Sequence, residues 1–253
     1  MIFRLFPQDF EAVGSYRLIY PYGLIEQNTE HEVIVEVGNR KGKKIELYMP
    51  DPQRGAPEED IFVFQNRLEE DAGRVVEWLV ENGKTVVVEL DDWWWDIPKG
   101  APAHNALKVV EGISLAALKR QVRAATFVTV STPKLAELVG EWNDNVHVIP
   151  NCVDAALLDF QRPRSDRVVI GWAGGASHAN DFAFVRNELK GYLRRTPEVD
   201  VHIIGTDYRR ELGRPDARLS GWSENLVEYL RKIDFSIGLA PSPTTPSTRP
   251  RAI

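Results

Sequence analysis

Short runs of β-branched and aliphatic residues alternate with amphipathic stretches along most of the chain. In the first half, runs typical of strands occupy Met1–Leu5, Glu32–Val37, Ile61–Gln65, Thr85–Leu90, Thr126–Val130 and Val146–Ile149. Between them, apolar residues recur every three or four positions, as they do on one face of a helix. This alternation predicts βαβ units on a parallel sheet.

The helices of the first half carry start and stop signals. The clearest covers Arg67–Asn82 and ends at Gly83, and a second covers Leu107–Arg123. A third is predicted to begin at Thr132, because threonine is a good N-cap and Pro133 suits the first turn.

A break rich in proline and charge follows, and the alternation then restarts. It gives strands and helices in turn: strand Arg167–Trp172, helix Asp181–Arg194, strand Val199–Ile204, helix Glu224–Arg231 and strand Phe235–Leu239. We therefore expect an α/β protein with two Rossmann-like domains, at residues 1–152 and 167–241, joined by a linker at 153–166. The second domain is expected to be incomplete, because a full doubly wound sheet needs roughly 120–150 residues.

Charge and composition narrow the class of protein. The 253 residues carry 31 Lys and Arg against 37 Asp and Glu, a net charge of −6, which argues against nucleic-acid binding. Cys152 is the only cysteine, which excludes a disulfide scaffold, and we expect it to be inert. No apolar run approaches the ~20 residues that cross a bilayer, and the start does not resemble a signal peptide. These features favour a cytoplasmic protein.

The first candidate site follows the first predicted strand. Gly14, Tyr16 and Arg17 lie on a loop that leads into a helix. Loops at the carboxyl ends of parallel strands form the ligand crevice, so the glycine could let the backbone approach a ligand and the arginine could supply a cation. A plain strand-to-helix turn is the alternative.

A second candidate site closes the fourth strand. Asp91 and Asp92 are candidate catalytic carboxylates, and the tryptophans at 93–95 could stack on a sugar or a base. The alternative is a loop anchored by buried tryptophan and capped by aspartate.

The strongest signal lies between Val169 and Asp181, where a glycine-rich turn joins a strand to a helix. Free backbone N–H groups and the helix dipole make such a turn an anion site, and we expect Gly174, Gly175, Ser177 and His178 to contribute to it. The turn is not a Walker loop. Gly-x-Gly-x-x-Gly occurs nowhere in the chain, which disfavours a nicotinamide-dependent epimerase or dehydrogenase.

The remaining histidines are predicted to have structural and not catalytic or metal-binding roles. His31, His147 and His202 lie in or beside strands, and none has metal-ligand spacing with cysteine or acidic partners. No metal site is expected.

Five stretches together resemble the GT-B glycosyltransferases, in particular the family-4-like group (glycosyl transferases group 1) of bacteria and phages. They are Gly14–Arg17 with Pro21, Glu89–Asp92, Val130–Thr132 with Val148–Asp154, Gly171–Gly174, and Ser220–Trp222 with Ile233–Pro241. The resemblance therefore covers residues 1–241.

This resemblance implies a nucleotide-sugar-dependent transferase with a hydroxyl acceptor. Gly14, Tyr16 and Arg17 would face the acceptor side, and the residues from Gly174 to His178 would lie near the donor diphosphate. The resemblance implies no metal and no cofactor, because such enzymes usually meet the charge of the leaving diphosphate with backbone amides, helix dipoles and basic side chains. It also implies that Pro150–Asp154 begins an interdomain hinge. The donor sugar, the acceptor and the oligomeric state stay open.

The last residues depart from the family pattern. Members of the group continue after Ala-Pro with an Asp-x-Pro-Phe-Asn segment, Lys-Ser and an acidic donor contact, where this chain has the irregular tail 242–253. Our hypothesis is that the tail is frameshifted and the second domain truncated. A non-catalytic remnant or binding module on a Rossmann-like scaffold is therefore the alternative to an active transferase.

Overall fold

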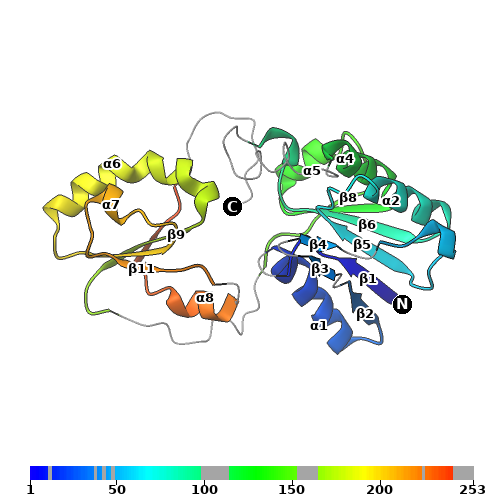
Figure 1. The fold of residues 1–253 in the computed structure, drawn as a ribbon, viewed down its shortest axis with the longest axis horizontal. Coiled ribbons are helices and arrows are strands. Elements are labelled where there is room, and N and C mark those ends of the chain that lie inside the picture. Colours follow the sequence, from blue (N-terminus) through cyan, green and yellow to red (C-terminus); the bar gives the residue numbers. More distant parts are fainter. Residues whose placement is uncertain are drawn as a thin grey trace. The chain divides into compact units, whose positions relative to one another are not determined.

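The computed structural model of the chain describes residues 1–10, 13–36, 39–41, 44–46, 49–97, 114–152, 165–223 and 226–241. Contacts divide these residues into a first unit, up to residue 152, and a second unit, from residue 165. Each unit is an α/β layer structure built on its own parallel sheet (Figure 1). The linker at 153–164 and the tail at 242–253 lie outside the described residues.

The first unit contains a six-stranded parallel sheet. Its strands run in the order β2-β1-β5-β6-β7-β8. Their bounds are β1 (Ile2–Phe6), β2 (Glu32–Val35), β5 (Ile61–Gln65), β6 (Thr85–Leu90), β7 (Phe127–Val130) and β8 (Val146–Val148). The chain changes direction across the sheet between β1 and β5, and ligands of such folds bind at the carboxyl ends of the strands near that point.

Helices cover both faces of this sheet. The helix α1 (Tyr20–Asn28) lies on one face, after the π-helical turn η1 (Ser15–Ile19), while α2 (Ala72–Glu81), α4 (Leu115–Ala124) and α5 (Pro133–Val139) lie on the other (Figure 1). The larger core packs these three helices against strand residues such as Phe64 and Val88, which are fully buried. A smaller core beneath α1 contains Leu5 and Leu18. Burial on both faces explains why the strands read as continuous apolar runs.

The predicted helix ends are confirmed where a capping residue fixes the end of the helix. Thr132 is the N-cap of α5, and its hydroxyl accepts a hydrogen bond from the backbone N–H of Leu135 (3.2 Å). Gly83 ends α2 with a φ of +76°, a conformation that favours glycine. The start of α2 at Ala72 is five residues later than predicted, because Arg67 is buried and donates to the carbonyl of Pro7 instead of starting the helix (2.9 Å).

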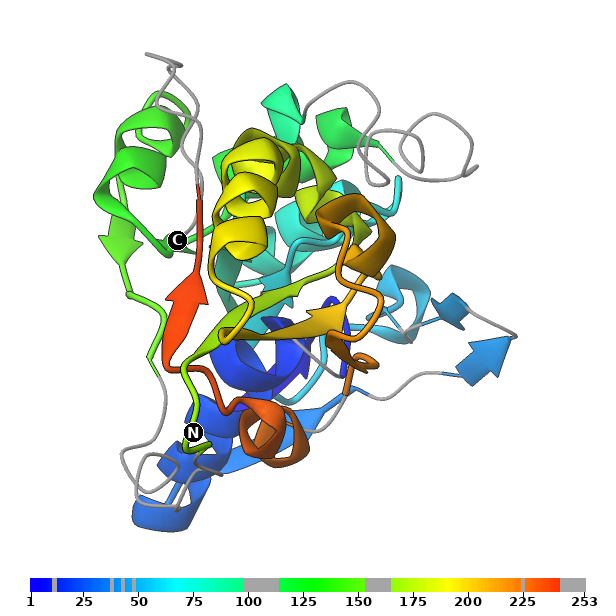
Figure 2. The same ribbon diagram turned by 90° about the vertical axis from the view of Figure 1, so that its left-hand side faces the viewer.

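The second unit contains a four-stranded parallel sheet in the order β11-β10-β9-β12. Its strands are β9 (Val169–Gly174), β10 (Asp200–Gly205), β11 (Arg218–Ser220) and β12 (Ile237–Leu239). The short turn η5 (Ala176–His178) leads into α6 (Ala179–Arg195), which lies with α7 (Arg209–Leu212) on one face, and α8 (Leu226–Lys232) lies on the other. In Figure 2 the strand β12 (red) runs beside β9, so the sheet changes direction next to the end of β9.

Several short elements were not predicted. They are the antiparallel hairpin β3 (Asn39–Lys41) and β4 (Lys44–Glu46), the 3₁₀ turns η2 (Pro52–Arg54) and η3 (Trp94–Asp96), the helix α7 and the strand β11. Each strand, turn or helix among them has three or four residues, which is too short for hydrophobic periodicity to show. The helix predicted at Leu107–Arg123 is described only from residue 114, where Ser114 caps α4. None of the described helices is long and apolar enough to span a membrane.

Candidate functional site

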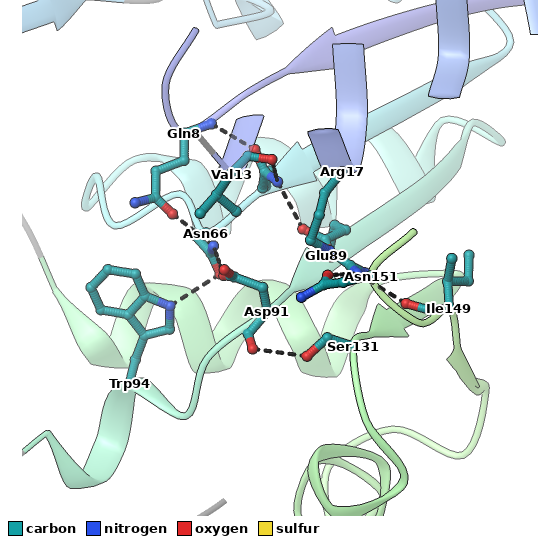
Figure 3. A network of polar contacts seen from close by, with 11 residues as sticks. Gln8, Val13, Arg17, Asn66, Glu89, Asp91, Trp94, Ser131, Ile149 and Asn151 are labelled. Atoms are coloured by element: carbon teal, nitrogen blue, oxygen red, sulfur yellow. Dashed lines mark hydrogen bonds and ion pairs between the residues drawn. The ribbon is translucent and has the colours of Figure 1, made fainter. Parts of the chain in front are cut away.

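Polar side chains meet at the carboxyl end of the first sheet, at its change of direction (Figure 3). We call this group the polar network. It consists of Gln8, Arg17, Gln65, Asn66, Glu89, Asp91, Trp94, Ser131 and Asn151, joined by hydrogen bonds and one ion pair. They come from η1, η3, the ends of β5 and β6, and the segments that follow β1, β5, β6, β7 and β8.

Arg17 is buried and links other members of the polar network. Its side chain is 3% exposed and forms an ion pair with Glu89. Its Nη1 also donates to the backbone oxygen of Ile149 (2.9 Å) and to Oδ1 of Asn151 (2.6 Å). This differs from the expectation of a free cation for a ligand, because the charge of Arg17 is already met inside the protein. Arg17 instead fixes the segment after β8 to the end of β6.

Glu89 is a buried carboxyl with an unusual proton affinity. Besides the ion pair with Arg17, its Oε2 accepts a hydrogen bond from Nε2 of Gln65 (3.0 Å). Burial raises the pKa of Glu89 to about 7, although the Arg17 guanidinium acts to lower it. The site therefore contains a carboxyl group that titrates near neutrality.

Asn66 is the hub of the network. Its Nδ2 donates to Oδ1 of Asp91 (2.6 Å) and to Oε1 of Gln8 (2.7 Å), and its Oδ1 accepts from Nε1 of Trp94 (3.0 Å). The backbone of Asn66 has a φ of +46°, the only positive value at a non-glycine residue that the described chain shows. Such strain persists only where the surroundings fix it, and it is concentrated at functional sites.

The two candidate catalytic carboxylates have different environments. Asp91 is buried, its backbone oxygen accepts from Oγ of Ser131 (2.9 Å), and burial raises its pKa while the bond from Asn66 lowers it. Asp92 is exposed. Tyr16 lies close enough to both for their charges to raise its pKa, although burial is the larger cause. The structure thus brings Tyr16, Asp91 and Asp92 together.

Gly14 is required for packing. A Cβ at this position would lie 1.8 Å from the backbone oxygen of Asp9, and the Gly14 N–H donates to Oδ1 of Asp9 (3.1 Å). The backbone that approaches Gly14 closely is therefore that of Asp9, where the sequence suggested a ligand.

Tryptophans form a cluster beside the polar network. The rings of Trp93 and Trp142 stack with centroids 5.3 Å apart, and Trp95 meets Trp142 edge-on at 4.6 Å. Lys119 lies over the Trp142 ring, 4.1 Å from its centroid. All three rings pack on the larger core of the first unit, so the ring faces are largely used within the protein.

In the second unit the glycine-rich turn lies at the carboxyl end of β9. Gly174 is the last residue of that strand, Gly175 precedes η5, and α6 begins at Ala179. Gly205, at the matching end of β10, has a φ of +101°, and a Cβ there would lie 2.4 Å from the Gly174 oxygen. The end of β10 therefore fits against the turn only with glycine at position 205.

His178 and Asp181 form a pair at the start of α6. Nδ1 of His178 lies 3.1 Å from Oδ2 of Asp181, whose side chain is largely buried while the imidazole is exposed. Asp181 thus orients the imidazole ring at the turn. The backbone of Ser177 belongs to η5, next to His178.

A second polar cluster of this unit centres on His202. Its Nδ1 lies 2.6 Å from Oδ1 of Asp234, and its Nε2 lies 2.8 Å from Oγ of Ser220. Arg218 pairs with the other oxygen of Asp234. Burial lowers the pKa of His202 to about 4, and the charge of Arg218 adds to this. This buried, neutral histidine joins three elements and has a structural position.

Comparisons with known proteins show a likeness in fold. No protein-family model matches the sequence, and no curated protein sequence matches it. Solved structures do match, among them an α-glucosyltransferase bound to UDP and a 13-mer DNA with a HMU base (TM-score 0.53, 14% identity, 87% of this chain and 66% of that one). The fold is that of GT-B glycosyltransferases.

Two further solved structures match the fold of this chain. One is S. aureus MnaA bound to UDP (TM-score 0.50, 11% identity, 91% of this chain and 70% of that one). The other is the catalytic domain of Starch Synthase IV from Arabidopsis thaliana bound to ADP and acarbose (TM-score 0.55, 9% identity, 94% and 77%). This chain therefore spans between 66% and 77% of the length of the three matched chains.

Sequence reasoning found the turn at Gly174–Gly175 but missed most of the polar network. Gln65 ends a strand and Asn66 follows it, and no motif marks either; Asn151 lies in the stretch Val148–Asp154, but nothing there indicated its contact with Arg17. The raised proton affinity of Glu89 depends on burial, which the sequence did not reveal. Cys152 is exposed, and the described residues contain no group of three His, Cys, Asp or Glu side chains that could hold a metal ion.

Proposed function

We propose that this chain transfers a sugar from a nucleotide-diphosphate donor to a hydroxyl acceptor. One observation carries the proposal: the turn at Gly174–Gly175 leads into α6 at the point where the second sheet changes direction. Nucleotides bind at this place in doubly wound folds, with their phosphates at the helix N-terminus. The GT-B fold and the UDP or ADP in the matched structures support the same assignment.

The donor side of this proposal consists of the residues from Gly174 to His178. Backbone N–H groups of the turn and the dipole of the 17-residue helix α6 attract the diphosphate, and His178 adds a side-chain donor when protonated. These groups compensate the charge of the leaving diphosphate without a metal ion. We therefore expect a donor site that works in the presence of a chelator.

The acceptor side consists of Tyr16 and the two carboxylates after β6. In the transfer, the acceptor oxygen forms a bond to the anomeric carbon, the bond from that carbon to the diphosphate breaks, and the hydroxyl proton passes to a carboxylate. Asp91 suits this last role, because burial raises its pKa and so makes it a stronger base than an exposed aspartate. Gly14 and Arg17 act indirectly, since they shape and anchor the π-helical turn η1, which carries Tyr16.

Membership of the family-4-like group is part of this proposal, as is a cytoplasmic location, where nucleotide-sugars would be available. A binding module without turnover is the second candidate. The observation behind it is nucleotide binding itself: the matched structures contain UDP or ADP, which supports a nucleotide site without requiring turnover.

Thermal unfolding of the full chain with UDP, ADP and GDP tests the donor assignment. Ligand at a hundredfold excess over Kd stabilises the folded state by about 2.7 kcal/mol, so one nucleotide should raise Tm selectively. Gly174→Val should abolish this shift, because a Cβ at Gly174 already lies 3.1 Å from the Trp172 indole. Gly191→Ala, within α6 and without a close contact, is the control. No shift with any nucleotide would contradict the proposal.

Turnover distinguishes the two candidates. The chain is incubated with the sugar derivative of the nucleotide that binds, and release of nucleoside diphosphate is followed. A transferase should release it, slowly to water or faster with an acceptor, and Asp91→Asn should reduce the rate about 100-fold or more. Asp92→Asn is expected to have a smaller effect. Binding without release would support the binding module.

A further inference from the structure

Trp172 has a buried polar group without a partner. It lies on β9, two residues before the end of the strand, and is 5% exposed. Its ring meets Phe182, in the first turn of α6, edge-on with centroids 5.1 Å apart, and Tyr208 at 6.3 Å. Among the hydrogen bonds of the described residues, none involves the indole Nε1. Nearly all buried N–H groups in proteins are paired, so an unpaired one calls for an explanation.

The unpaired edge of this indole lies at the glycine-rich turn. A Cβ placed on Gly174 would lie 3.1 Å from Nε1 and 3.2 Å from the two ring carbons beside it. The backbone of Gly174 thus covers the nitrogen-bearing edge of the ring. A Cβ placed on Gly175 would meet no atom within 4 Å, so the space next to the turn is open. The nitrogen-bearing edge of the indole therefore lies next to a turn that has open space beside it.

The segment that forms the turn has no basic side chain of the lysine or arginine type to pair with an anion. No lysine or arginine occurs from Val168 to Val185. Asp181 adds a negative charge in the first turn of α6, although it faces His178. The segment of the turn itself therefore offers a diphosphate neutral N–H donors and no lysine or arginine. A desolvated indole N–H is a strong donor toward a charged oxygen, because hydrogen bonds to ionised groups are about twice as strong as neutral ones.

We propose that the indole N–H of Trp172 is a binding group for a phosphate oxygen of the nucleotide. This rests on the proposed function, which places the diphosphate at the same turn. Because backbone covers Nε1 in the ligand-free chain, the turn opens at Gly174 and Gly175 when the nucleotide binds. The phosphate then satisfies the N–H group, and the cost of leaving it unpaired in the free protein adds to the specificity for an anion.

Nuclear magnetic resonance of the full chain tests this directly. The seven tryptophans give seven indole N–H signals in a ¹⁵N-labelled sample, and the Trp172 signal is the one missing from Trp172→Phe. On titration with the nucleotide that stabilises the chain, we expect the Trp172 signal to shift downfield and more than the other six. A Trp172 signal that stays in place while nucleotide binds would overturn the inference and leave the donor site standing.

Affinity gives a second readout. Trp172→Phe keeps an aromatic ring in the core but removes the N–H, and it should weaken nucleotide binding about tenfold or more. Trp78→Phe, on α2 of the first unit, is the matched control and should bind like the wild type. The indole signal of Trp222, the other tryptophan of the second unit, reports whether that unit is still folded in Trp172→Phe. Equal affinity of the two variants overturns the inference, and absence of binding by the wild type overturns both it and the proposed function.

Discussion

Glu89 and Arg17 show how burial changes the chemistry of single side chains. Each is less than 5% exposed, and their charges face each other within the polar network. A buried carboxyl next to a guanidinium experiences two opposing effects, and here burial prevails and raises the pKa to about 7. Breaking such a pair by removing one partner is costly, because the other charge stays buried without compensation.

The raised pKa of Glu89 predicts a specific pH dependence of stability. Between about pH 4.5 and 7 the folded chain holds a proton on Glu89 that the unfolded chain has lost, so the unfolding free energy falls as pH rises. At 1.36 kcal/mol per pKa unit the loss reaches up to about 3 kcal/mol. Urea unfolding of the wild type and of Glu89→Gln across this pH range measures the loss. The difference in unfolding free energy between the two should shrink as the pH rises. Glu137→Gln changes an exposed glutamate and is the control; its unfolding free energy should have the same pH dependence as that of the wild type.

Asn66 predicts a second effect at the residue scale. Asn66→Ala removes three hydrogen bonds and leaves Asp91 and the Trp94 N–H without their partner, so we expect a loss of about 2–4 kcal/mol in unfolding free energy. The pKa of Asp91 should rise further, since the bond from Asn66 lowers it. Asn28→Ala, whose amide donates to a carbonyl on the exposed end of α1, should cost far less. Similar losses for both variants would contradict the role of Asn66 as hub.

The elements that could be predicted from the sequence are those whose bounds are set by residues within the element or next to it. Thr132 caps α5 and Gly83 ends α2, and both signals act within one turn of helix. The strand β11 could not be predicted, because Arg218–Ser220 has no apolar pattern and is held by pairing with β10. In the same way Gln65 ends a predicted strand and Asn66 follows it, but their partners lie 24 to 58 positions away in the sequence.

A prediction at the scale of elements concerns the ends of β9 and β10, which meet at Gly174 and Gly205. Gly205→Ala forces a Cβ into the Gly174 oxygen and an unfavourable φ of +101°. It should therefore cost about 2 kcal/mol or more in unfolding free energy and weaken nucleotide binding at the turn. Gly221→Ala follows β11, where an added Cβ meets nothing within 4 Å. Thermal unfolding with and without nucleotide should separate the two variants, and equal behaviour would mean that the strand ends do not shape the turn.

At the scale of the whole molecule, the restart of the βα pattern after residue 167 indicated a second sheet, and the structure confirms two parallel sheets. The order of strands within each sheet could not be predicted, because the apolar strands are similar enough in sequence for several orders to bury them equally well. That order decides the site, since it places the ends of β1, β5 and β6 together and sets the glycine turn beside the change of direction.

The division into two units predicts a localised response to ligand. Hydrogen exchange with and without the stabilising nucleotide should show slower exchange at the amides of 174–182 and at the ends of β9 and β10. The strands of the first sheet should change little on nucleotide alone, because the donor site is assigned to the second unit. Protection centred on the first unit would move the donor site to the polar network.

The stacked tryptophans of the first unit have an optical consequence. Trp93, Trp95 and Trp142 lie with ring centroids 4.6 to 5.3 Å apart, close enough for their electronic transitions to couple. Coupled indoles produce paired circular-dichroism bands of opposite sign that vanish when the rings separate. Trp172 and Trp222 of the second unit have their ring contacts with phenylalanine and tyrosine instead. The chain therefore carries an intrinsic chromophore for the first unit, with which its melting can be followed separately from that of the second.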